Sequence, residues 1–241
     1  MKPLSKGRYT VRVAQSGADR AAALTLRGLC FGAAGGVADA FDAAATQVIV
    51  ENVQTCAIVA TFRMALLDGV QLPQSYAAQF YDLSALTAYP GSMLELGRFC
   101  IDPALSDPDV LRIAWAALTA YVDEAGIKLL FGCSSFQGTQ AAPYLDAFAL
   151  LKARHLAPAR WSPQIKAEHV FDYALELHDK PDLKQANAAM PPLLRTYLMM
   201  GGWVSDHAVI DHQMNTLHVF TGLEIGSISP ARKTLLRALL S

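Results

Sequence analysis

Several features that mark common classes of protein are missing from this sequence. It contains no Cys-x-x-Cys pair, which argues against a structural zinc site and against a thioredoxin-like redox site. We expect buried free thiols in a reducing cytosol, with disulfides as the alternative. The cysteines concerned are Cys30, Cys56, Cys100 and Cys133.

Long hydrophobic runs are also missing. No stretch of about 18 apolar residues occurs, so no segment is expected to span a bilayer. Residues 1–13 lead into a strand pattern without the apolar stretch of a signal peptide. The sequence therefore predicts a cytoplasmic protein, with peripheral contact at the inner face of the membrane as the only membrane association.

An excess of charge of one sign is lacking as well. The net charge of -1 and the pI of about 6.6 provide no field that would recruit nucleic acid. Aromatic residues do not alternate with basic ones as a stacking groove requires, so we expect no nucleic-acid partner. Hydrophobic residues make up 53% of the chain and charged residues 17%, which predicts a sizeable core and one apolar surface or tunnel.

The hydrophobic periodicity predicts strands first, then alternating strands and helices, then further strands. Strands are expected over residues 8–13, 47–51, 56–67, 93–101, 128–134, 203–210 and 217–222, and helices over 16–31, 107–125, 143–154 and 191–198, with a short C-terminal helix. Residues 32–36 are expected to form a loop, 68–91 to be irregular or lightly helical, and 172–189 to be a solvated helix and loop. This order predicts one α/β or α+β domain with a central mixed sheet.

Two helices carry clear start signals. Ser16 or Asp19 can cap the first. The second begins at Asp107 with proline at its first position, and Gly126 ends it. The buried faces are expected to be Ala22, Leu26 and Leu29 in the first helix, and Leu111, Trp115, Leu118 and Val122 in the second.

Four short motifs occur in a fixed order along the first hundred residues. They are Leu26-Arg27 followed by Phe31, then Asp39-Ala40-Phe41-Asp42, then Thr61-Phe62-Arg63, and last Glu95-Leu96-Gly97-Arg98-Phe99. This ordered set resembles the acyl-homoserine-lactone synthases and the ornithine-lipid synthases. Both are GNAT-like families that take acyl groups from acyl carrier protein.

Later segments resemble the ornithine-lipid synthases more closely. They are residues 130–136 with Gly138-Thr139, residues 155–158, residues 191–198, Gly201-Gly202 and Asp211. The resemblance covers about residues 8–220. The chain departs from the family pattern at Ala45-Thr46-Gln47, where members often carry a cysteine and a histidine, and in the Gly/Ala loop after Phe31.

The resemblance implies a GNAT-like fold, with a mostly antiparallel sheet flanked by helices and a C-terminal extension over about residues 160–241. It implies transfer of a β-hydroxyacyl chain from the phosphopantetheine of acyl carrier protein to the α-amine of an amino acid. Ornithine is the expected acceptor and a lyso-ornithine lipid the product, with no bound cofactor and no metal. The alternatives are an acyl-homoserine-lactone-type signal synthase and a non-catalytic lipid- or membrane-binding protein.

Amide formation from a thioester needs a neutral amine, donors for the developing oxyanion and two aligned substrates. Glu95 is the candidate base, because its apolar strand neighbours could raise the pKa of a carboxyl group. The alternative is a structural ion pair with Arg98 or Arg63. Glu95 and Arg98 are three residues apart, so they share a face only if a bulge intervenes, for which Gly97 is suited.

The remaining candidates follow from the resemblance. Backbone N–H groups near Phe99 and Cys100 are expected to bind the acyl oxygen, with Ser134 and Ser135 near the acyl chain and Phe31 near the substrate. Arg63 and Arg98 are candidates for binding the amino acid carboxylate or the pantetheine phosphate, or else each neutralises Asp39, Asp42 or Glu95. Asp39 and Asp42 are candidates for the substrate ammonium, or else cap a loop and pair with arginine. Arg27 is expected to tie that loop to the first helix.

Lys152, Arg154 and Arg160, with Lys166 nearby, form a basic segment. It is either a docking patch for the acidic carrier protein or an ordinary solvated face.

Residues 101–125 contain no glycine. A coenzyme-A-binding GNAT protein usually carries a glycine-rich loop at this helix start, where backbone N–H groups hold the pyrophosphate. The sequence therefore favours a carrier-protein thioester as the donor. Its histidines form no His-x-x-x-x-Asp motif, and Asp206, His207, Asp211 and His212 are expected to have structural roles.

Overall fold

The computed structural model describes residues 1–33 and 36–238. The chain divides into two compact units that alternate along the sequence. Unit 1 comprises Met1–Leu66, Leu96–Ile127 and Ser229–Ser241, and unit 2 comprises Leu67–Glu95 and Lys128–Ile228. That these units form one domain with a C-terminal extension stays a prediction. No helix among the described residues combines the length and the apolar character needed to cross a membrane.

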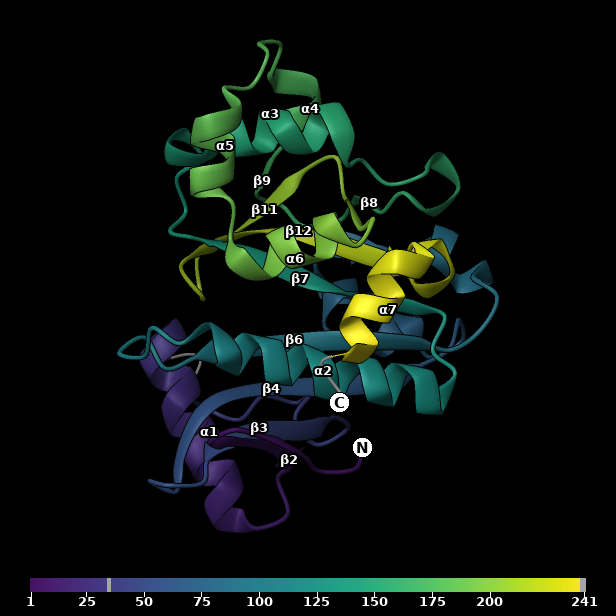
Figure 1. The fold of residues 1–241 in the computed structure, drawn as a ribbon. Coiled ribbons are helices and arrows are strands. Elements are labelled where there is room, and N and C mark those ends of the chain that lie inside the picture. Colours follow the sequence, from purple (N-terminus) through teal and green to yellow (C-terminus); the bar gives the residue numbers. More distant parts are fainter. Residues whose placement is uncertain (34–35, 239–241) are drawn as a thin grey trace. The chain divides into compact units, whose positions relative to one another are not determined.

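Unit 1 is built on antiparallel strands that follow one another in sequence. They are β1 (Leu4–Lys6), β2 (Tyr9–Val13), β3 (Thr46–Asn52) and β4 (Ala57–Leu67), and β4 neighbours β6 (Met93–Ile101). Helix α1 (Gly17–Phe31) packs on β3, while α2 (Pro108–Ala125) packs on β1, β2 and α7 (Pro230–Ala238). Figure 1 shows α1 at one end of the strands and α7 beside α2.

The expected helix starts in unit 1 are confirmed. The Ser16 side chain accepts from the Asp19 backbone, and the Asp19 carboxylate accepts in return from the Ser16 N–H, so the two form a capping box. Asp107 caps α2, and Gly126 ends it in the left-handed conformation with φ 65°. The buried stripe expected for α1 is wrong at Leu29, which is 66% exposed. Its buried residues are Ala23, Leu26 and Arg27.

Unit 2 contains the parallel part of the sheet. Residues Met93–Glu95 of β6 pair in parallel with β7 (Leu129–Gln137), and β7 pairs antiparallel with β12 (Thr216–Glu224). Strands β11 (Ala208–Asp211) and β10 (Trp203–Val204) pair with β12, β9 (Val170–Phe171) pairs with β11, and β5 (Tyr81–Asp82) forms a separate ribbon with β8 (Gln164–Ile165). The expected mixed, mostly antiparallel sheet is therefore confirmed. The short strands β1, β5, β8 and β9 were not expected, and the single strand expected over residues 203–210 is divided into β10 and β11.

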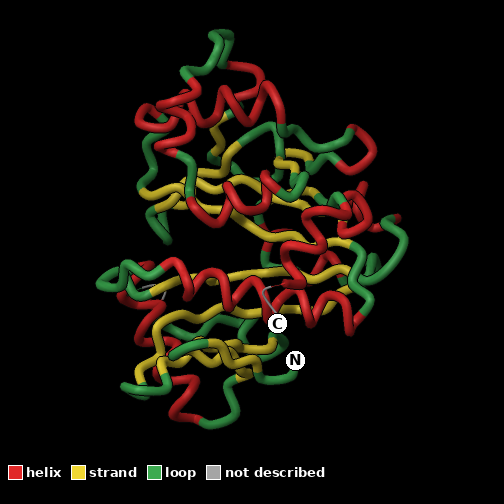
Figure 2. Tube along the Cα trace, viewed as in Figure 1, coloured by secondary structure: helices red, strands yellow, loops and turns green. Residues whose placement is uncertain are grey.

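The helices of unit 2 are short. They are α3 (Leu145–Arg154), α4 (Tyr173–Glu176), α5 (Leu183–Ala189) and α6 (Pro192–Met199). The irregular segment expected before β6 is confirmed as three 3₁₀ turns, Leu72–Gln74, Ala77–Gln79 and Ser84–Ala88, and Figure 2 shows such short helical pieces joined by loops.

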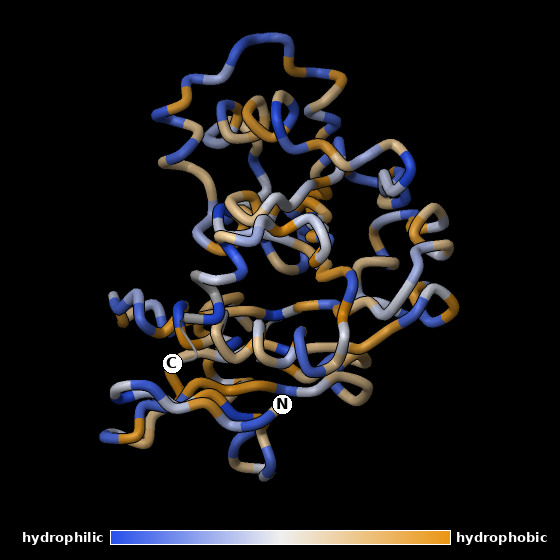
Figure 3. The backbone as a smooth tube through the Cα atoms, turned by 45° about the vertical axis from the view of Figure 1, so that its right-hand side comes forward, coloured by the Kyte–Doolittle hydropathy of each residue, from blue (hydrophilic) through white to orange (hydrophobic). Residues whose placement is uncertain are grey.

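The hydrophobic cores of unit 2 lie on the two faces of β7 and β12, because alternate residues of a strand point to opposite sides. Phe136, Leu217 and Val219 pack beneath α3, α5 and α6. On the other face, the rings of Phe131 and Phe220 stack with their centroids 5.7 Å apart and pack against the 3₁₀ turns. Figure 3 colours the backbone by hydropathy, with the hydrophobic stretches in orange.

The four cysteines are free thiols. Cys100 is buried, and Cys30 and Cys133 are half-buried. The expectation of burial is wrong for Cys56, which is exposed in the turn between β3 and β4 with a φ of 58°. A tight turn, rather than the core, determines its position.

Gly222 on β12 lies opposite Trp203 on β10. A Cβ atom at this position would lie 2.4 Å from the Trp203 ring, and that ring is buried. We expect Gly222→Ala to destabilise the protein by about 1–3 kcal/mol through overpacking. Chemical denaturation measures the change. The control is Gly226→Ala, which meets no atom within 4 Å, and an equal loss in both variants would contradict this explanation.

Candidate active site

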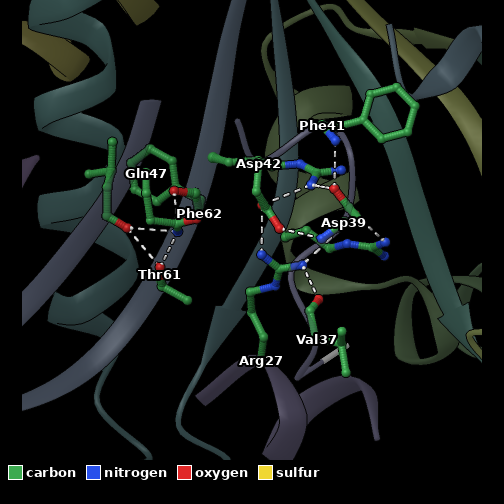
Figure 4. Close-up of polar contacts among 11 residues, drawn as sticks. Arg27, Val37, Asp39, Phe41, Asp42, Gln47, Thr61 and Phe62 are labelled. Carbon is green, nitrogen blue, oxygen red and sulfur yellow. Dashed lines mark hydrogen bonds and ion pairs between the residues drawn. The ribbon is translucent and has the colours of Figure 1, made fainter. Parts of the chain in front are cut away.

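Three guanidinium groups and two carboxylates from four separate segments meet in unit 1. Arg27 comes from α1, Arg63 from β4 and Arg98 from β6, while Asp39 and Asp42 lie in the turn before β3. The sequence spacing alone places none of them together. Their ion pairs form one connected network, called here the Arg/Asp cluster (Figure 4).

The turn at residues 39–42 is held by its own carboxylates. The Asp42 side chain accepts the Asp39 N–H at 2.8 Å, and the Asp39 side chain accepts the Phe41 N–H at 3.0 Å. Arg27 donates to Asp42 at 2.8 Å and to the Val37 carbonyl at 3.5 Å, although its side chain is only 1% exposed. The expected tie between this loop and α1 is therefore confirmed. The two aspartates both cap the turn and pair with arginine, so these two structural roles occur at the same time.

Arg63 joins the two carboxylates. Its Nη1 atom lies 2.5 Å from Asp39 and 3.0 Å from Asp42, and its guanidinium stands 5.6 Å from the Phe41 ring centroid. A Cβ atom on Gly97 would lie 3.2 Å from Arg63 Nε. Glycine at this position therefore lets the arginine pass close to the β6 backbone.

The strand β6 is irregular at the residue after that glycine. Arg98 has a φ of 53°, a left-handed conformation that is unusual for a residue with a side chain. Gly97 was expected to allow a bulge at this point, and the residue that adopts the left-handed conformation is its neighbour Arg98. Arg98 donates to Asp39 at 3.0 Å, and this charged hydrogen bond helps to hold the unusual backbone.

The Arg/Asp cluster keeps Asp39 ionised. Burial alone would raise the pKa of this carboxyl group, but the hydrogen bonds and charges of Arg63 and Arg98 outweigh burial and lower it. Asp39 therefore carries its negative charge throughout the pH range in which the protein is expected to work.

Glu95 belongs to unit 2 and is 6% exposed. Its two carboxylate oxygens accept the backbone N–H groups of Tyr76 and Ala77, at 2.9 Å and 2.8 Å. These amides open the 3₁₀ turn Ala77–Gln79, so Glu95 fixes the start of that turn. Sequence reasoning missed both donors, because a backbone amide has no signature in residue type.

Phe99 and Cys100 follow the left-handed residue on β6. The Phe99 ring stacks on Phe62 with centroids 5.2 Å apart. Cys100 is buried and shares a hydrogen bond with Cys30, which donates to the Ile101 carbonyl at 3.3 Å. That contact and burial raise the pKa of the Cys100 thiol, so this cysteine stays protonated. Phe31, at the end of α1, is half-buried.

Ser134 and Ser135 point to opposite faces of β7. Ser134 is buried and accepts a hydrogen bond from Thr221 at 2.9 Å, whereas Ser135 is exposed. One site can therefore contain at most one of the two hydroxyl groups.

The basic segment is partly used inside unit 2. Lys152 donates to the Leu177 carbonyl at 2.6 Å, and Lys166 donates to the Ala78 carbonyl at 2.5 Å. Arg160 lies 3.9 Å from Glu224 and over the Trp161 ring, and Arg154 is exposed. Arg154, Arg160 and Lys166 are exposed, whereas Lys152 is half-buried.

The carboxylate of Asp107 caps the start of α2. The Asp107 carboxylate accepts the Asp109 N–H at 2.9 Å, the Tyr9 hydroxyl at 2.8 Å and an Arg8 N–H at 2.5 Å. Its hydrogen bonds to Arg8 and Asp109 lower the pKa of Asp107 to about 2. Pro108 has no N–H, so the first turn offers few donors to another anion. Among the described residues, no group of three or more His, Cys, Asp or Glu side chains could hold a metal ion.

The family model described as an acetyltransferase (GNAT) domain matches residues 27–116, which contain the whole Arg/Asp cluster. An L-ornithine N(alpha)-acyltransferase of Rhodobacter capsulatus is 33% identical over 173 residues, 71% of this chain and 66% of that protein. One of Rhizobium meliloti is 32% identical over 177 residues, 71% of this chain and 59% of its own length. The chain is a GNAT-like acyltransferase related to the L-ornithine N(alpha)-acyltransferases.

This relationship confirms the family resemblance drawn from the four motifs. The curated relatives are longer, and the match spans 59% to 66% of their length. Among solved structures, FeeM, an N-acyl amino acid synthase from uncultured soil microbes, superimposes with a TM-score of 0.56 at 14% identity, covering 95% of this chain and all of that one. It confirms the GNAT fold, a mixed, mostly antiparallel sheet with flanking helices.

The lowered pKa of Asp39 predicts a pH dependence of stability. A depressed pKa contributes stability above the unfolded value of about 3.9, and this contribution is lost as the pH falls through the folded value. The difference in unfolding free energy between wild type and Asp39→Asn should therefore be largest near pH 6 and shrink below about pH 4. Denaturant titrations at several pH values measure it, with the exposed Asp109→Asn as the surface control. A difference that is constant with pH would contradict this assignment.

Proposed function

We propose that this protein is an N-acyltransferase that moves a β-hydroxyacyl chain from acyl carrier protein to the α-amine of an amino acid, most simply ornithine, to give a lyso-ornithine lipid. The observation that carries the proposal is the Arg/Asp cluster on the GNAT fold of a chain related to enzymes named for ornithine N(alpha)-acylation.

The start of α2 supports a carrier-protein donor. Coenzyme A would bring a pyrophosphate to this helix terminus, where Asp107 already accepts the available N–H group and Asp109 adds a second negative charge. A phosphopantetheine arm has no pyrophosphate, so it avoids this repulsion. Arg154 and Arg160 are the surface charges we assign to docking the acidic carrier protein, and contact with the inner face of the membrane would be peripheral.

The reaction forms a carbon–nitrogen bond and breaks a carbon–sulfur bond. The neutral α-amine attacks the thioester carbonyl, the pantetheine thiolate leaves, and the proton lost by the amine is returned to the thiolate. The backbone N–H groups of Phe99 and Cys100 are the proposed oxyanion donors, because the left-handed Arg98 makes β6 irregular just before them. Glu95 is the proposed base, directly or through a water.

Reconstitution with purified components tests this function. The full chain is incubated with ornithine and either a β-hydroxyacyl carrier protein or the matching acyl-coenzyme A, and the N-acyl product is measured by mass spectrometry. We expect kcat/KM at least about tenfold higher for the carrier-protein donor, which corresponds to about 1.4 kcal/mol of transition-state stabilisation. Equal use of both donors would contradict the donor assignment. Folded protein that acylates no amino acid would favour a non-catalytic lipid-binding role.

Glu95→Gln separates the base from the structural alternative. We expect turnover with ornithine to fall more than about tenfold, because glutamine cannot accept the proton. Hydroxylamine is already neutral at working pH, so it needs little help from a base, and its acylation should be largely retained in the variant. If Glu95 only fixes the turn at Tyr76 and Ala77, both acceptors will lose activity alike.

A further inference from the structure

Unit 1 contains an open pocket of about 570 Å³ beside the Arg/Asp cluster, within the range typical of small-molecule sites. Part of its wall is apolar and is formed by Leu24 and several alanines. Its polar lining comes from Arg20 and Arg27 on α1, Asp39 and Asp42 in the turn, and Thr46 and Gln47 at the start of β3. The walls of one pocket therefore carry both positive and negative groups.

The positive group available to a ligand is Arg20. Its side chain is exposed and makes no hydrogen bond or ion pair with the residues that the structure describes. Arg27, the other arginine of the lining, is already committed to Asp42. Because a guanidinium presents paired N–H donors, Arg20 is suited to a carboxylate.

The negative groups of the pocket are the carboxylates of Asp39 and Asp42, which pair with arginines of the Arg/Asp cluster. Arg63 and Arg98 contact Asp39 and keep it ionised, while the Asp39 and Asp42 side chains remain 26% and 18% exposed. A carboxylate oxygen can accept two hydrogen bonds, and Asp42 Oδ2 accepts one, from the Asp39 N–H. Acceptor capacity therefore remains for an ammonium group.

Gln47 adds a neutral acceptor whose orientation is fixed. Its side-chain nitrogen donates to the Phe62 carbonyl at 2.9 Å and to Thr61 Oγ1 at 2.5 Å (Figure 4). The Thr61 hydroxyl donates to the Val48 carbonyl, so both partners of the amide nitrogen act as acceptors there. The amide cannot flip without losing both bonds, and its oxygen makes no hydrogen bond within the described part of the chain.

We infer that this pocket binds an amino acid that carries a second ammonium group. Arg20 holds the α-carboxylate, and Asp39, Asp42 and the Gln47 oxygen hold the side-chain ammonium. This inference rests on the proposed function and deepens it. An ammonium held by ionised carboxylates keeps its proton and has no lone pair, so the α-amine is the nucleophile left to react. The pocket thereby accounts for α- over side-chain acylation.

Calorimetric titration of the full chain without any acyl donor tests the inference. Ornithine is compared with putrescine, which lacks the carboxylate, and with norvaline, which lacks the side-chain amine. We expect Arg20→Ala to weaken ornithine binding about tenfold, as the loss of a charged hydrogen-bonded pair does, and to change putrescine binding less than about twofold. Norvaline should bind wild type at least about tenfold more weakly than ornithine.

The matched control is Arg112→Ala, an exposed arginine outside this pocket, which should leave all three affinities unchanged. The inference is overturned if Arg20→Ala affects ornithine and putrescine equally or not at all, or if norvaline binds as tightly as ornithine. Because no donor is present, the pocket and the reaction are tested separately. The expected binding pattern without acyl transfer would contradict the proposed function alone, and acyl transfer with an insensitive Arg20→Ala variant would contradict the pocket alone.

Discussion

The pairing of Arg27 with Asp42 is the constraint around which unit 1 is arranged. A guanidinium that is 1% exposed must find a carboxylate, because an uncompensated buried charge costs several kcal/mol. The pair brings the turn at residues 39–42 against α1, and Arg63 then extends the network to β4. Breaking such a buried pair costs about 3–5 kcal/mol in other proteins, a large share of total stability. The network therefore sets the position of a loop that has little hydrophobic core of its own.

The same network connects structure to chemistry. Asp39 pairs with Arg98, whose left-handed backbone makes β6 irregular immediately before Phe99 and Cys100. The Arg/Asp cluster also presents carboxylates to the pocket lined by Arg20 and Gln47. One set of ion pairs thus borders both the strand irregularity proposed to bind the thioester oxygen and the pocket proposed to bind the amino acid. Arg27 and Asp39-Ala40-Phe41-Asp42 are separate motifs in the sequence, but their charged side chains belong to the same ion-pair network.

Local features of the fold could be predicted from the sequence because local chemistry decides them. The Ser16 and Asp107 caps, the Gly126 stop and the β3–β4 hairpin are each encoded within a few residues. Predictions failed where tertiary packing decides. Leu29 fits a hydrophobic stripe but is exposed, and Arg27, a charged residue, is buried in its place. Arg27 is buried because it pairs with a carboxylate from a turn that is distant in the sequence. Hydrophobic periodicity cannot reveal such a partner.

The residues of the candidate site could be predicted from the sequence, but the contacts between them could not. Family resemblance identified the five charged residues of the cluster, but the order of pairing among them depends on backbone paths. Gly97 was expected to allow a bulge, but the left-handed conformation of Arg98 and the close approach of Arg63 to Gly97 could not be predicted from spacing. The amides that bind Glu95 and the fixed amide of Gln47 carry no signal in residue type or spacing. They become visible only when the partners are placed in space.

Mass spectrometry of total lipids from cells expressing this chain, compared with an empty vector, shows whether the protein N-acylates an amino acid. We expect a new lipid whose mass and fragments correspond to a β-hydroxyacyl group in amide linkage to the α-nitrogen of ornithine. If no new aminolipid forms in cells that contain folded protein, acyl carrier protein and ornithine, the protein is not an ornithine N-acyltransferase.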